Sequence, residues 1–286
     1  MGPRARIQSI MKLHIVTPPP RQGWAWIQLA FMVYMRQAWP FTALLMLFFF
    51  VFSLLSVTPV VGPFLSLMCM PLLTLVFMIN TERVALNKPF EWSAIGAPIQ
   101  APKPIQKQLL ILLVFYALAM ILGLKLCDAF DNDRFTQLLT LIGNAKPTAE
   151  AQKEVENLLS DPMLTYGLML RSSVIGIVAV PFWYAPTLVY WNQQSAAQAL
   201  FSSTVACWRT RKALAMNILA WSGLMVIISV FIGLVMPLLG LAGLVSWIAL
   251  PLGLVLTAVF YVSLYFMYKD TFAAIASVDA SGDTAR

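Results

Sequence analysis

The sequence has little charge and few residues suited to catalysis or metal binding. Aspartate, glutamate, lysine and arginine make up 11% of the 286 residues, against roughly a quarter in soluble domains. There is one histidine, His14, and the cysteines Cys69, Cys127 and Cys207 stand far apart without a CxxC spacing. A zinc site or a serine nucleophile with a histidine base is therefore not expected. Because no nucleophile elbow or glycine-rich phosphate loop occurs either, we expect no enzyme activity, cofactor or bound metal.

Apolar residues dominate the chain instead. Hydrophobic residues make up 60% of the sequence, and the mean hydropathy is +0.78. The clearest segments are two apolar runs, 213–236 and 244–268, which are separated by a short break at 237–240. Each run exceeds the ~20 residues that a helix needs to cross a bilayer. This pair predicts a transmembrane hairpin, so most of the remaining chain is interpreted as a membrane protein.

Six transmembrane spans are predicted within one membrane domain that covers residues 24–268. Their approximate bounds are 41–57, 64–79, 108–124, 168–190, 213–236 and 244–268. Apolar residues at helical spacing beside tryptophan or basic residues predict two interfacial helices, at about 24–39 and 195–208. The predicted fold class is an all-α bundle of six transmembrane helices with two interfacial helices and one acidic extracytoplasmic loop.

That loop, 127–165, is the largest segment between predicted spans. It carries seven acidic residues against three basic ones. Short helices are expected around 135–142 and from Thr148, as a cap, to Leu159. Together they are expected to form a lid on the membrane surface.

The two ends of the chain are polar. Residues 1–23 are basic and contain no apolar core before a cleavage site, so we expect a disordered segment rather than a cleaved signal peptide. Met11 offers a second plausible start. Residues 270–286 are expected to form a disordered tail.

The basic residues set the expected orientation. Lysine and arginine number 5, 4, 3 and 2 in the segments before span one, between spans two and three, between four and five, and after six. The opposite set has Lys125, directly after span three, and three more, all in the acidic loop. The positive-inside rule therefore predicts that both termini are cytoplasmic.

The same distribution bears on the partner of the basic residues. The net charge of +7 comes from residues that flank apolar segments and form no stripe along a polar helix. We therefore expect membrane lipids, anionic ones among them, and not nucleic acid as the partner. Arg209, Arg211 and Lys212, with Arg36, are candidates for a lipid-headgroup site, since each such charge contributes ~1 kcal/mol near an anionic leaflet. The alternative, that they only determine topology, stays open.

Two further cations lie at the outer ends of spans three and four. Lys125 and Arg171 flank the acidic loop, and one interpretation is that they snorkel or pair with Asp128 or Asp161. The other is an outward-facing site for an anion.

The two hairpins that open and close the membrane region echo each other. The first turn reads Pro59-Val60-Val61-Gly62 and the second Pro237-Leu238-Leu239-Gly240, and each is followed by a proline inside the next span, at Pro71 and Pro251. This pattern is typical of a parallel repeat. It also agrees with the general frequency of proline and glycine at membrane turns, and both explanations stay open.

Two stretches resemble known families. Pro20-Arg21-Gln22-Gly23-Trp24-Ala25-Trp26-Ile27 with Arg36-Gln37-Ala38-Trp39-Pro40 resembles the opening of a family of uncharacterised proteobacterial polytopic inner-membrane proteins. Ala185-Pro186-Thr187-Leu188-Val189 with Ala199-Leu200-Phe201-Ser202-Ser203 is similar to the membrane domain found beside glycerophosphodiester phosphodiesterases. The resemblance implies a multi-pass protein of the bacterial inner membrane with six spans, and it implies no activity.

The function expected from these patterns is non-enzymatic. A lipid-contacting, scaffolding or accessory role comes first, and a small permease or transporter component is the alternative. Pro181, Pro186 and Pro251 interrupt predicted spans, and broken helices can line a transport path. A membrane-protein partner or a homo-oligomer remains an open possibility.

Overall fold

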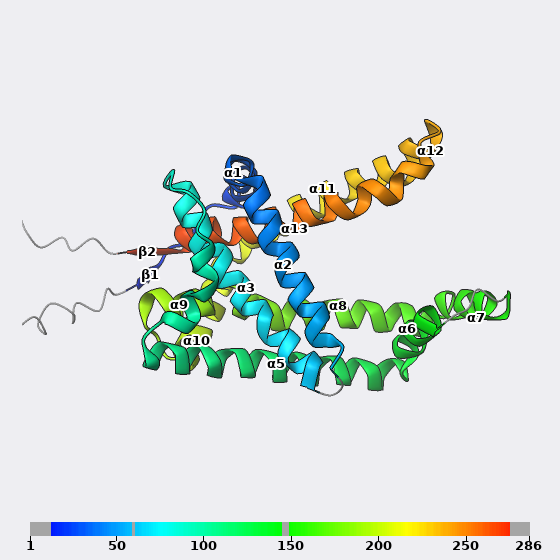
Figure 1. Ribbon diagram of the computed structural model, residues 1–286, viewed down its shortest axis with the longest axis horizontal. Helices are drawn as coiled ribbons and strands as arrows, with labels where there is room; N and C mark the ends of the chain where they lie inside the picture. Colours follow the sequence, from blue (N-terminus) through cyan, green and yellow to red (C-terminus); the bar gives the residue numbers. More distant parts are fainter. Residues whose placement is uncertain (1–12, 59–60, 145–148, 275–286) are drawn as a thin grey trace, which may run out of the picture. The chain divides into compact units, whose positions relative to one another are not determined.

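The computed structural model describes residues 13–58, 61–144 and 149–274. Within these ranges the chain is helical apart from its turns and one pair of short strands (Figure 1). Six of the described segments are long and apolar enough to cross a membrane. They cover Ala38–Ser56, Val61–Ala85, Lys103–Asp131, Pro162–Asn192, Arg211–Leu238 and Trp247–Thr271. The fold is that of an all-α polytopic membrane protein.

The chain, which we expected to form one domain over 24–268, divides into two compact units. The first unit comprises Met1–Met46, Val76–Ala94 and Thr204–Arg286, and the second comprises Leu47–Leu75 and Ile95–Ser203. Three helices contain residues of both units: α2 (Ala38–Ser56), α3 (Val61–Ala85) and α10 (Ala196–Arg209). The units are interleaved in sequence, so neither corresponds to one continuous half of the chain.

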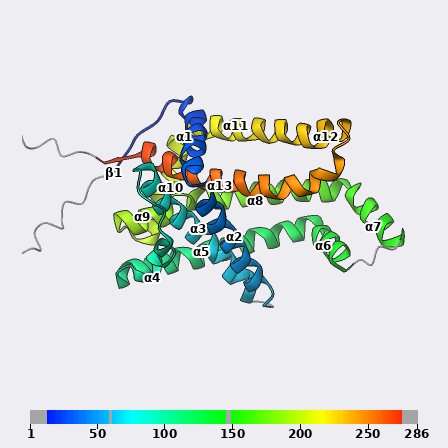
Figure 2. The same ribbon diagram turned by 45° about the horizontal axis from the view of Figure 1, so that its top comes forward.

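The first unit is built around a helix near its beginning and a hairpin near its end. Its other described elements are α1 (Gln22–Arg36), α11 (Arg211–Val230), the π-helix η3 (Phe231–Val235), α12 (Met236–Leu238), the 3-10 helix η4 (Ala242–Leu244) and α13 (Val245–Thr271). Figure 2 shows α1 against the ends of α11 and α13 that lie away from α12. Helix α1 therefore closes the open end of this hairpin.

A glycine permits the close contact between α1 and α11. A Cβ atom at Gly23 would clash with the carbonyl oxygen of Ala213 and would lie 2.7 Å from the backbone nitrogen of Asn217. The side-chain amide of Asn217 donates to the carbonyl oxygen of Gly23 at 2.9 Å. In lipid, helices gain little from apolar burial, so close backbone approach and interhelical hydrogen bonds carry much of their association. Gly23 and Asn217 supply both.

The core of the first unit is aromatic and apolar. Trp26 and Phe41 are fully buried, and the ring of Phe41 stacks on that of Phe77 with centroids 5.8 Å apart. The ring of Phe77 in turn contacts that of Tyr261 on α13 at 5.1 Å. These contacts connect α2, α3 and α13.

The segment before α1 differs from the disordered amino terminus expected over 1–23. Residues Leu13–Ile15 form strand β1, which pairs antiparallel with β2 (Phe272–Ala274), so that His14 lies opposite Ala273. The expected tail 270–286 is likewise ordered at its start, because α13 continues to Thr271 before β2. Each segment supplies the other with backbone partners, and this pairing is not visible in either segment alone. Residues 1–12 and 275–286, including Met11, lie outside the described residues.

The second unit centres on an antiparallel helix pair. Its elements are α4 (Ala97–Gln100), α5 (Lys103–Asp131), α6 (Arg134–Asn144), α7 (Ala149–Leu159), α8 (Pro162–Phe182) and α9 (Ala185–Asn192), with the 3-10 helix η2 (Trp92–Gly96) at its boundary. Tyr116 on α5 contacts Phe182 on α8 with ring centroids 4.9 Å apart, and the space beside Gly123 is filled by Val174. Figure 1 shows α5 and α8 side by side.

The fourth predicted span is divided in two. Helix α8 ends at Phe182, directly after Pro181, and α9 begins at Ala185 with Pro186 in its first turn. A proline removes one helix hydrogen bond and disfavours helical geometry in the residue before it. The break at Trp183 and Tyr184 lies where these two prolines place it.

Several helices run further than the predicted spans. The segment 80–107, expected to be a polar loop, contains the end of α3, up to Ala85, and the start of α5, at Lys103. Leaving the membrane does not end a helix; α3 stops only before Asn87, whose φ of 58° lies in the left-handed region. The acidic loop 127–165 similarly loses its first residues to α5 and its last residues to α8.

The helices predicted at 24–39 and 195–208 are found with shifted bounds. The first helix ends at Arg36, and Trp39 belongs to α2, because Gln37 breaks the helix at φ −145°. The second corresponds to α10. Helix α6 covers the predicted 135–142, whereas Thr148, the predicted cap of α7, lies outside the described residues, as do Pro59 and Val60 of the first repeated turn.

Candidate functional site

The charges singled out from the sequence fall into two places. Arg209, Arg211 and Lys212 lie at the junction of α10 and α11, in the first unit. Lys125 and Arg171 lie on α5 and α8, in the second unit. The electrostatics of these two places differ.

A buried threonine forms the junction between α10 and α11. The hydroxyl of Thr210 donates to the carbonyl oxygen of Ala206 at 2.9 Å, and α11 begins at the next residue. Arg209, Arg211 and Lys212 are all exposed on the surface of this junction. The guanidinium of Arg211 lies 5.1 Å from the centre of the Trp208 ring and donates to the carbonyl oxygen of Trp208 at 3.3 Å.

The outward face of α10 carries aromatic residues. Phe201 and Trp208, seven residues apart, lie two turns apart on the same face, and each is 71% exposed. The opposite face, with Ala199, Ser203 and Ala206, is buried. An exposed tryptophan beside an arginine is typical of a helix at the membrane–water boundary.

Two more cations lie at the same end of the first unit. Gly23 contacts Ala213 on α11, as described above, and Arg21 precedes α1 by one residue. The side chains of Gln22 and Trp26 both donate to one carboxylate oxygen of Asp270, at 2.7 and 2.8 Å. Lys269 precedes Asp270, so the start of α1, the start of α11 and the end of α13 meet.

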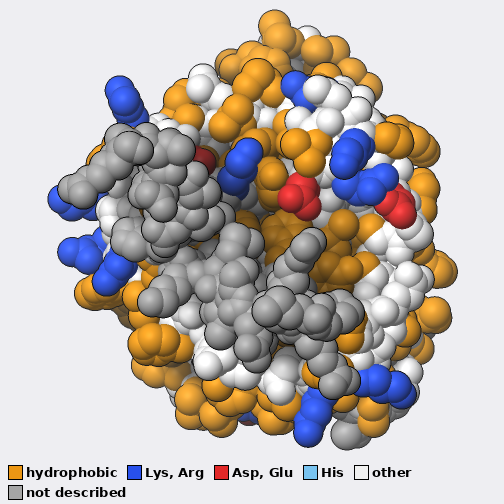
Figure 3. All heavy atoms as spheres, turned by 90° about the vertical axis from the view of Figure 1, so that its left-hand side faces the viewer, with side chains coloured by type: hydrophobic (Ala, Val, Ile, Leu, Met, Phe, Trp, Pro, Cys, Tyr) orange, Lys and Arg blue, Asp and Glu red, His pale blue; other side chains and the backbone are white. Residues whose placement is uncertain are grey.

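We call the resulting set of exposed cations the basic end. It consists of Arg21, Arg209, Arg211, Lys212 and Lys269. Across the described residues 13–58, 61–144 and 149–274, no ion pair joins any of these five to an acidic side chain. Figure 3 shows one face of the molecule, on which lysine and arginine side chains project beside hydrophobic ones. The basic end is therefore a concentration of positive charge, of which the carboxylate of Asp270 at the same place offsets one charge.

Arg36, the fourth residue of the predicted headgroup site, is not part of the basic end. It lies at the far end of α1 from Arg21, about 20 Å away at the helical rise of ~1.5 Å per residue. Its guanidinium donates to the side-chain oxygen of Asn87 at 2.9 Å and to the carbonyl oxygen of Val84 at 3.5 Å. These bonds fasten α1 to the end of α3.

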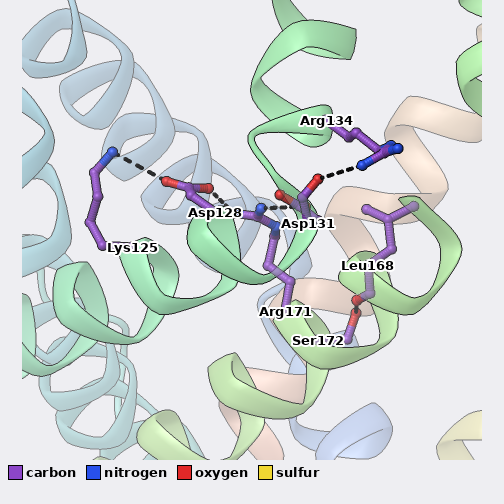
Figure 4. A network of polar contacts seen from close by, with 7 residues as sticks. All are labelled: Lys125, Asp128, Asp131, Arg134, Leu168, Arg171 and Ser172. Atoms are coloured by element: carbon purple, nitrogen blue, oxygen red, sulfur yellow. Dashed lines mark hydrogen bonds and ion pairs between the residues drawn. The ribbon is translucent and has the colours of Figure 1, made fainter. Parts of the chain in front are cut away.

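The second place is a chain of alternating charges, shown in Figure 4. Lys125 contacts one oxygen of Asp128 at 3.2 Å, and the other oxygen of Asp128 accepts from Arg171 at 2.9 Å. Arg171 also donates to Asp131 at 3.0 Å. Arg134 continues the series by pairing with Asp161.

Burial makes Arg171 the centre of this chain. Arg171 is 8% exposed and Asp131 is 0% exposed, whereas the side chain of Lys125 is 73% exposed. The Arg171 guanidinium also lies 4.3 Å from the centre of the Phe135 ring. A Cβ atom at Gly167 would lie 2.6 Å from that of Asp131, so the glycine gives the carboxylate its room.

This arrangement bears on the two interpretations of Lys125 and Arg171. Two carboxylates of α5 face the two cations, so the four formal charges sum to zero. Arg171 pairs with Asp128, as one interpretation proposed, but its second partner is Asp131 and not Asp161. The structure thus shows the ion pairs of the first interpretation, and an anion site at these two cations stays a prediction.

Asp161 has a different task at the start of α8. Its carboxylate caps the helix by accepting from the backbone amide of Met163 at 2.8 Å. That hydrogen bond, followed by the one from Arg134, holds the pKa of Asp161 below its usual range. Because Asp161 is engaged in this way, it is not available to Arg171.

Comparison with known proteins agrees with the fold. A curated relative, a probable inner membrane protein of Burkholderia thailandensis, is 24% identical over 260 residues, which cover 91% of this chain and 94% of the relative. The chain is a multi-pass membrane protein. No family model matches it, and no solved structure matches it.

Proposed function

We propose that the protein has a non-enzymatic, lipid-contacting role in the bacterial inner membrane, with the basic end as its contact to anionic headgroups. The observation that carries the proposal is the set of five exposed cations with no acidic partner among the described residues. Phosphate is the complementary group that a membrane offers in quantity.

Magnitudes favour the basic end over the charge chain of the second unit. Each lysine or arginine near an anionic surface contributes about 1 kcal/mol. Five of them, opposed by the one negative charge of Asp270, therefore supply at most about 4 kcal/mol, and screening by salt lowers this value. The chain around Arg171 has no net charge, so its attraction to a phosphate is small by comparison.

The proposal includes an orientation. The basic end, Arg36 and the cations between α3 and α5 face the cytosol, and α6 and α7 face outward. The excess of lysine and arginine in the proposed cytosolic segments supports this assignment. The anionic lipids of the cytosolic leaflet are then within reach of the basic end.

Native mass spectrometry of the purified full chain tests the proposal. The triple variant Arg209→Gln, Arg211→Gln and Lys212→Gln is expected to bind phosphatidylglycerol up to about a hundredfold more weakly than the unchanged protein, since at most about 3 kcal/mol of attraction is removed. The matched control changes three exposed cations outside the basic end: Lys88→Gln, Lys103→Gln and Lys107→Gln. Equal retention by both variants would contradict the proposal.

One observation favours the alternative, a small permease. The span formed by α8 and α9 is broken at Trp183 and Tyr184, and discontinuous helices occur at the binding sites of many transporters. A permease predicts solute flux across proteoliposomes that stops when cysteines introduced near Pro181 and Pro186 are blocked. Absence of flux under these conditions, together with lipid retention at the basic end, selects the lipid-contacting role.

A further inference from the structure

We infer that the lipid bound at the basic end carries two phosphates on one headgroup, as diphosphatidylglycerol does. This inference rests on the proposed function, and it names the lipid class that the site fits best. The five cations form two groups, and an exposed apolar surface follows each group. Binding one lipid with two phosphates costs less than binding two separate lipids.

The cations form two groups on different helices. Arg209, Arg211 and Lys212 belong to the α10–α11 junction, whereas Arg21 and Lys269 belong to the start of α1 and the end of α13. The contact between Gly23 and Ala213 joins the two groups. Packed helices have axes ~8–10 Å apart, and a glycine contact favours the short end of that range. The two groups therefore lie on adjacent helices, and we expect one headgroup in which a glycerol bridges two phosphates to reach both.

Asp270 fixes the second group in place and offsets one of its two positive charges. One of its carboxylate oxygens accepts from both Gln22 and Trp26, and no ion pair with a described cation involves it. The carboxylate therefore ties the end of α13 to the start of α1. As a result, Arg21 and Lys269 are held near each other although they are far apart in sequence.

Each group is followed by an exposed apolar surface. Beyond Lys212, the side chains of Met216 and Leu219 lie on successive turns of α11 and are exposed. Beyond Arg21, the side chains of Trp24 and Met32 on α1 are exposed as well. A lipid with two phosphates carries two pairs of acyl chains, so each phosphate brings its own apolar chains to one of these surfaces.

Linkage favours one such lipid over two lipids with single phosphates. Once the first phosphate is bound, the second reaches its cations as an intramolecular partner at high effective concentration. The gain from linkage in well-matched systems is 10²- to 10⁴-fold. We expect at least about a tenfold preference here, because the flexible headgroup loses part of that gain.

Competition between two lipids tests the inference. The full chain is equilibrated with diphosphatidylglycerol and phosphatidylglycerol at equal total phosphate, and the retained lipids are counted by native mass spectrometry. The unchanged protein is expected to retain the two-phosphate lipid with at least about a tenfold preference. The variant Arg21→Gln with Lys269→Gln is expected to lose the preference while it still retains phosphatidylglycerol through the other group.

The controls distinguish a failure of the two-phosphate inference from a failure of the proposed function. Lys103→Gln with Lys107→Gln removes the same charge outside the basic end and is expected to leave the preference unchanged, and circular dichroism checks that each variant is folded. Retention of both lipids in proportion to their phosphate would overturn the two-phosphate inference and leave the proposed function standing. If neither lipid is retained by the unchanged protein, both fail.

Discussion

Removal of the buried cation at Arg171 is expected to destabilise the second unit strongly. The variant Arg171→Met keeps much of the side-chain volume but leaves Asp131, which is fully buried, without its ion pair. Loss of one partner from a buried ion pair costs about 3–5 kcal/mol. The lower end applies here, since Asp128 keeps Lys125 as a partner. A change of about 3 kcal/mol corresponds to roughly a 150-fold change in the unfolding equilibrium.

Unfolding in mixed micelles, titrated with a denaturing detergent and followed by circular dichroism, measures this change. Lys125→Met is the matched control on the same chain of charges. Its side chain is 73% exposed, and exposed pairs contribute only about 0–1 kcal/mol. The double variant Arg171→Met with Asp131→Asn is expected to recover most of the loss, because the unpaired carboxylate is gone.

The stabilities of these variants are expected to follow one order. Arg171→Met must be the least stable, and the double variant must be more stable than Arg171→Met alone. If Arg171→Met is no worse than Lys125→Met, the pair with Asp131 does not hold α5 against α8. Arg171 would then be available to an outside ligand after all, and anion binding should be measured next.

Three further outcomes are expected. Gly23→Ala should destabilise the first unit by about 1–3 kcal/mol, because its Cβ meets backbone atoms of α11, whereas Gly143→Ala, with nothing within 4 Å, should be neutral or slightly stabilising in the same detergent titration. The pKa of Asp161 is lowered, so the stabilisation of α8 by its carboxylate is complete above the ordinary carboxyl pKa of about 3.9. This stabilisation is lost as the pH falls from there through the pKa of the folded state. Asp161→Asn should remove the contribution of Asp161 to the acid dependence of the melting curves. In a background without native cysteines, an impermeant maleimide on intact cells should label Gln137→Cys on α6 and not Thr204→Cys on α10, and the reverse pattern would invert the proposed orientation.

The spans could be predicted from the sequence, because lipid requires a long uncharged run wherever a helix crosses it. The ends of the helices could not. Glu82 and Arg83 look like the start of a loop by composition, yet both remain in α3. The helix ends before Asn87, which has the left-handed conformation. Asparagine adopts this conformation too seldom for the sequence alone to predict it.

The candidate site shows the same division between local and distant information. Arg209, Arg211 and Lys212 are neighbours in sequence, so their clustering was visible at once. Arg21 and Lys269 were counted only toward orientation, since the contact that brings their segments together joins residues 248 positions apart. The sequence of either segment alone does not indicate that the start of α1 and the end of α13 meet. The Gln22–Asp270 hydrogen bond in the structure shows it.

The charge chain contained a signal that sequence reasoning passed over. Asp128 and Asp131 are three residues apart, which places them on one face of a helix. One arginine on a facing helix can therefore reach both. Asp161 competed with Asp131 as the candidate partner, and its position just before Pro162 at the start of α8 could have marked it as a cap.

The contact between Trp26 and Asp270 has a consequence for biosynthesis. The two residues are 244 positions apart, so the ribosome completes α1 long before α13 emerges. The face around Gly23 gains its partner when α11 emerges, whereas the indole of Trp26 lacks the carboxylate of Asp270 until the end of α13 is made. A chain that ends before α13 would therefore hold α1 against α11 alone, without the hydrogen bonds from Gln22 and Trp26 to Asp270.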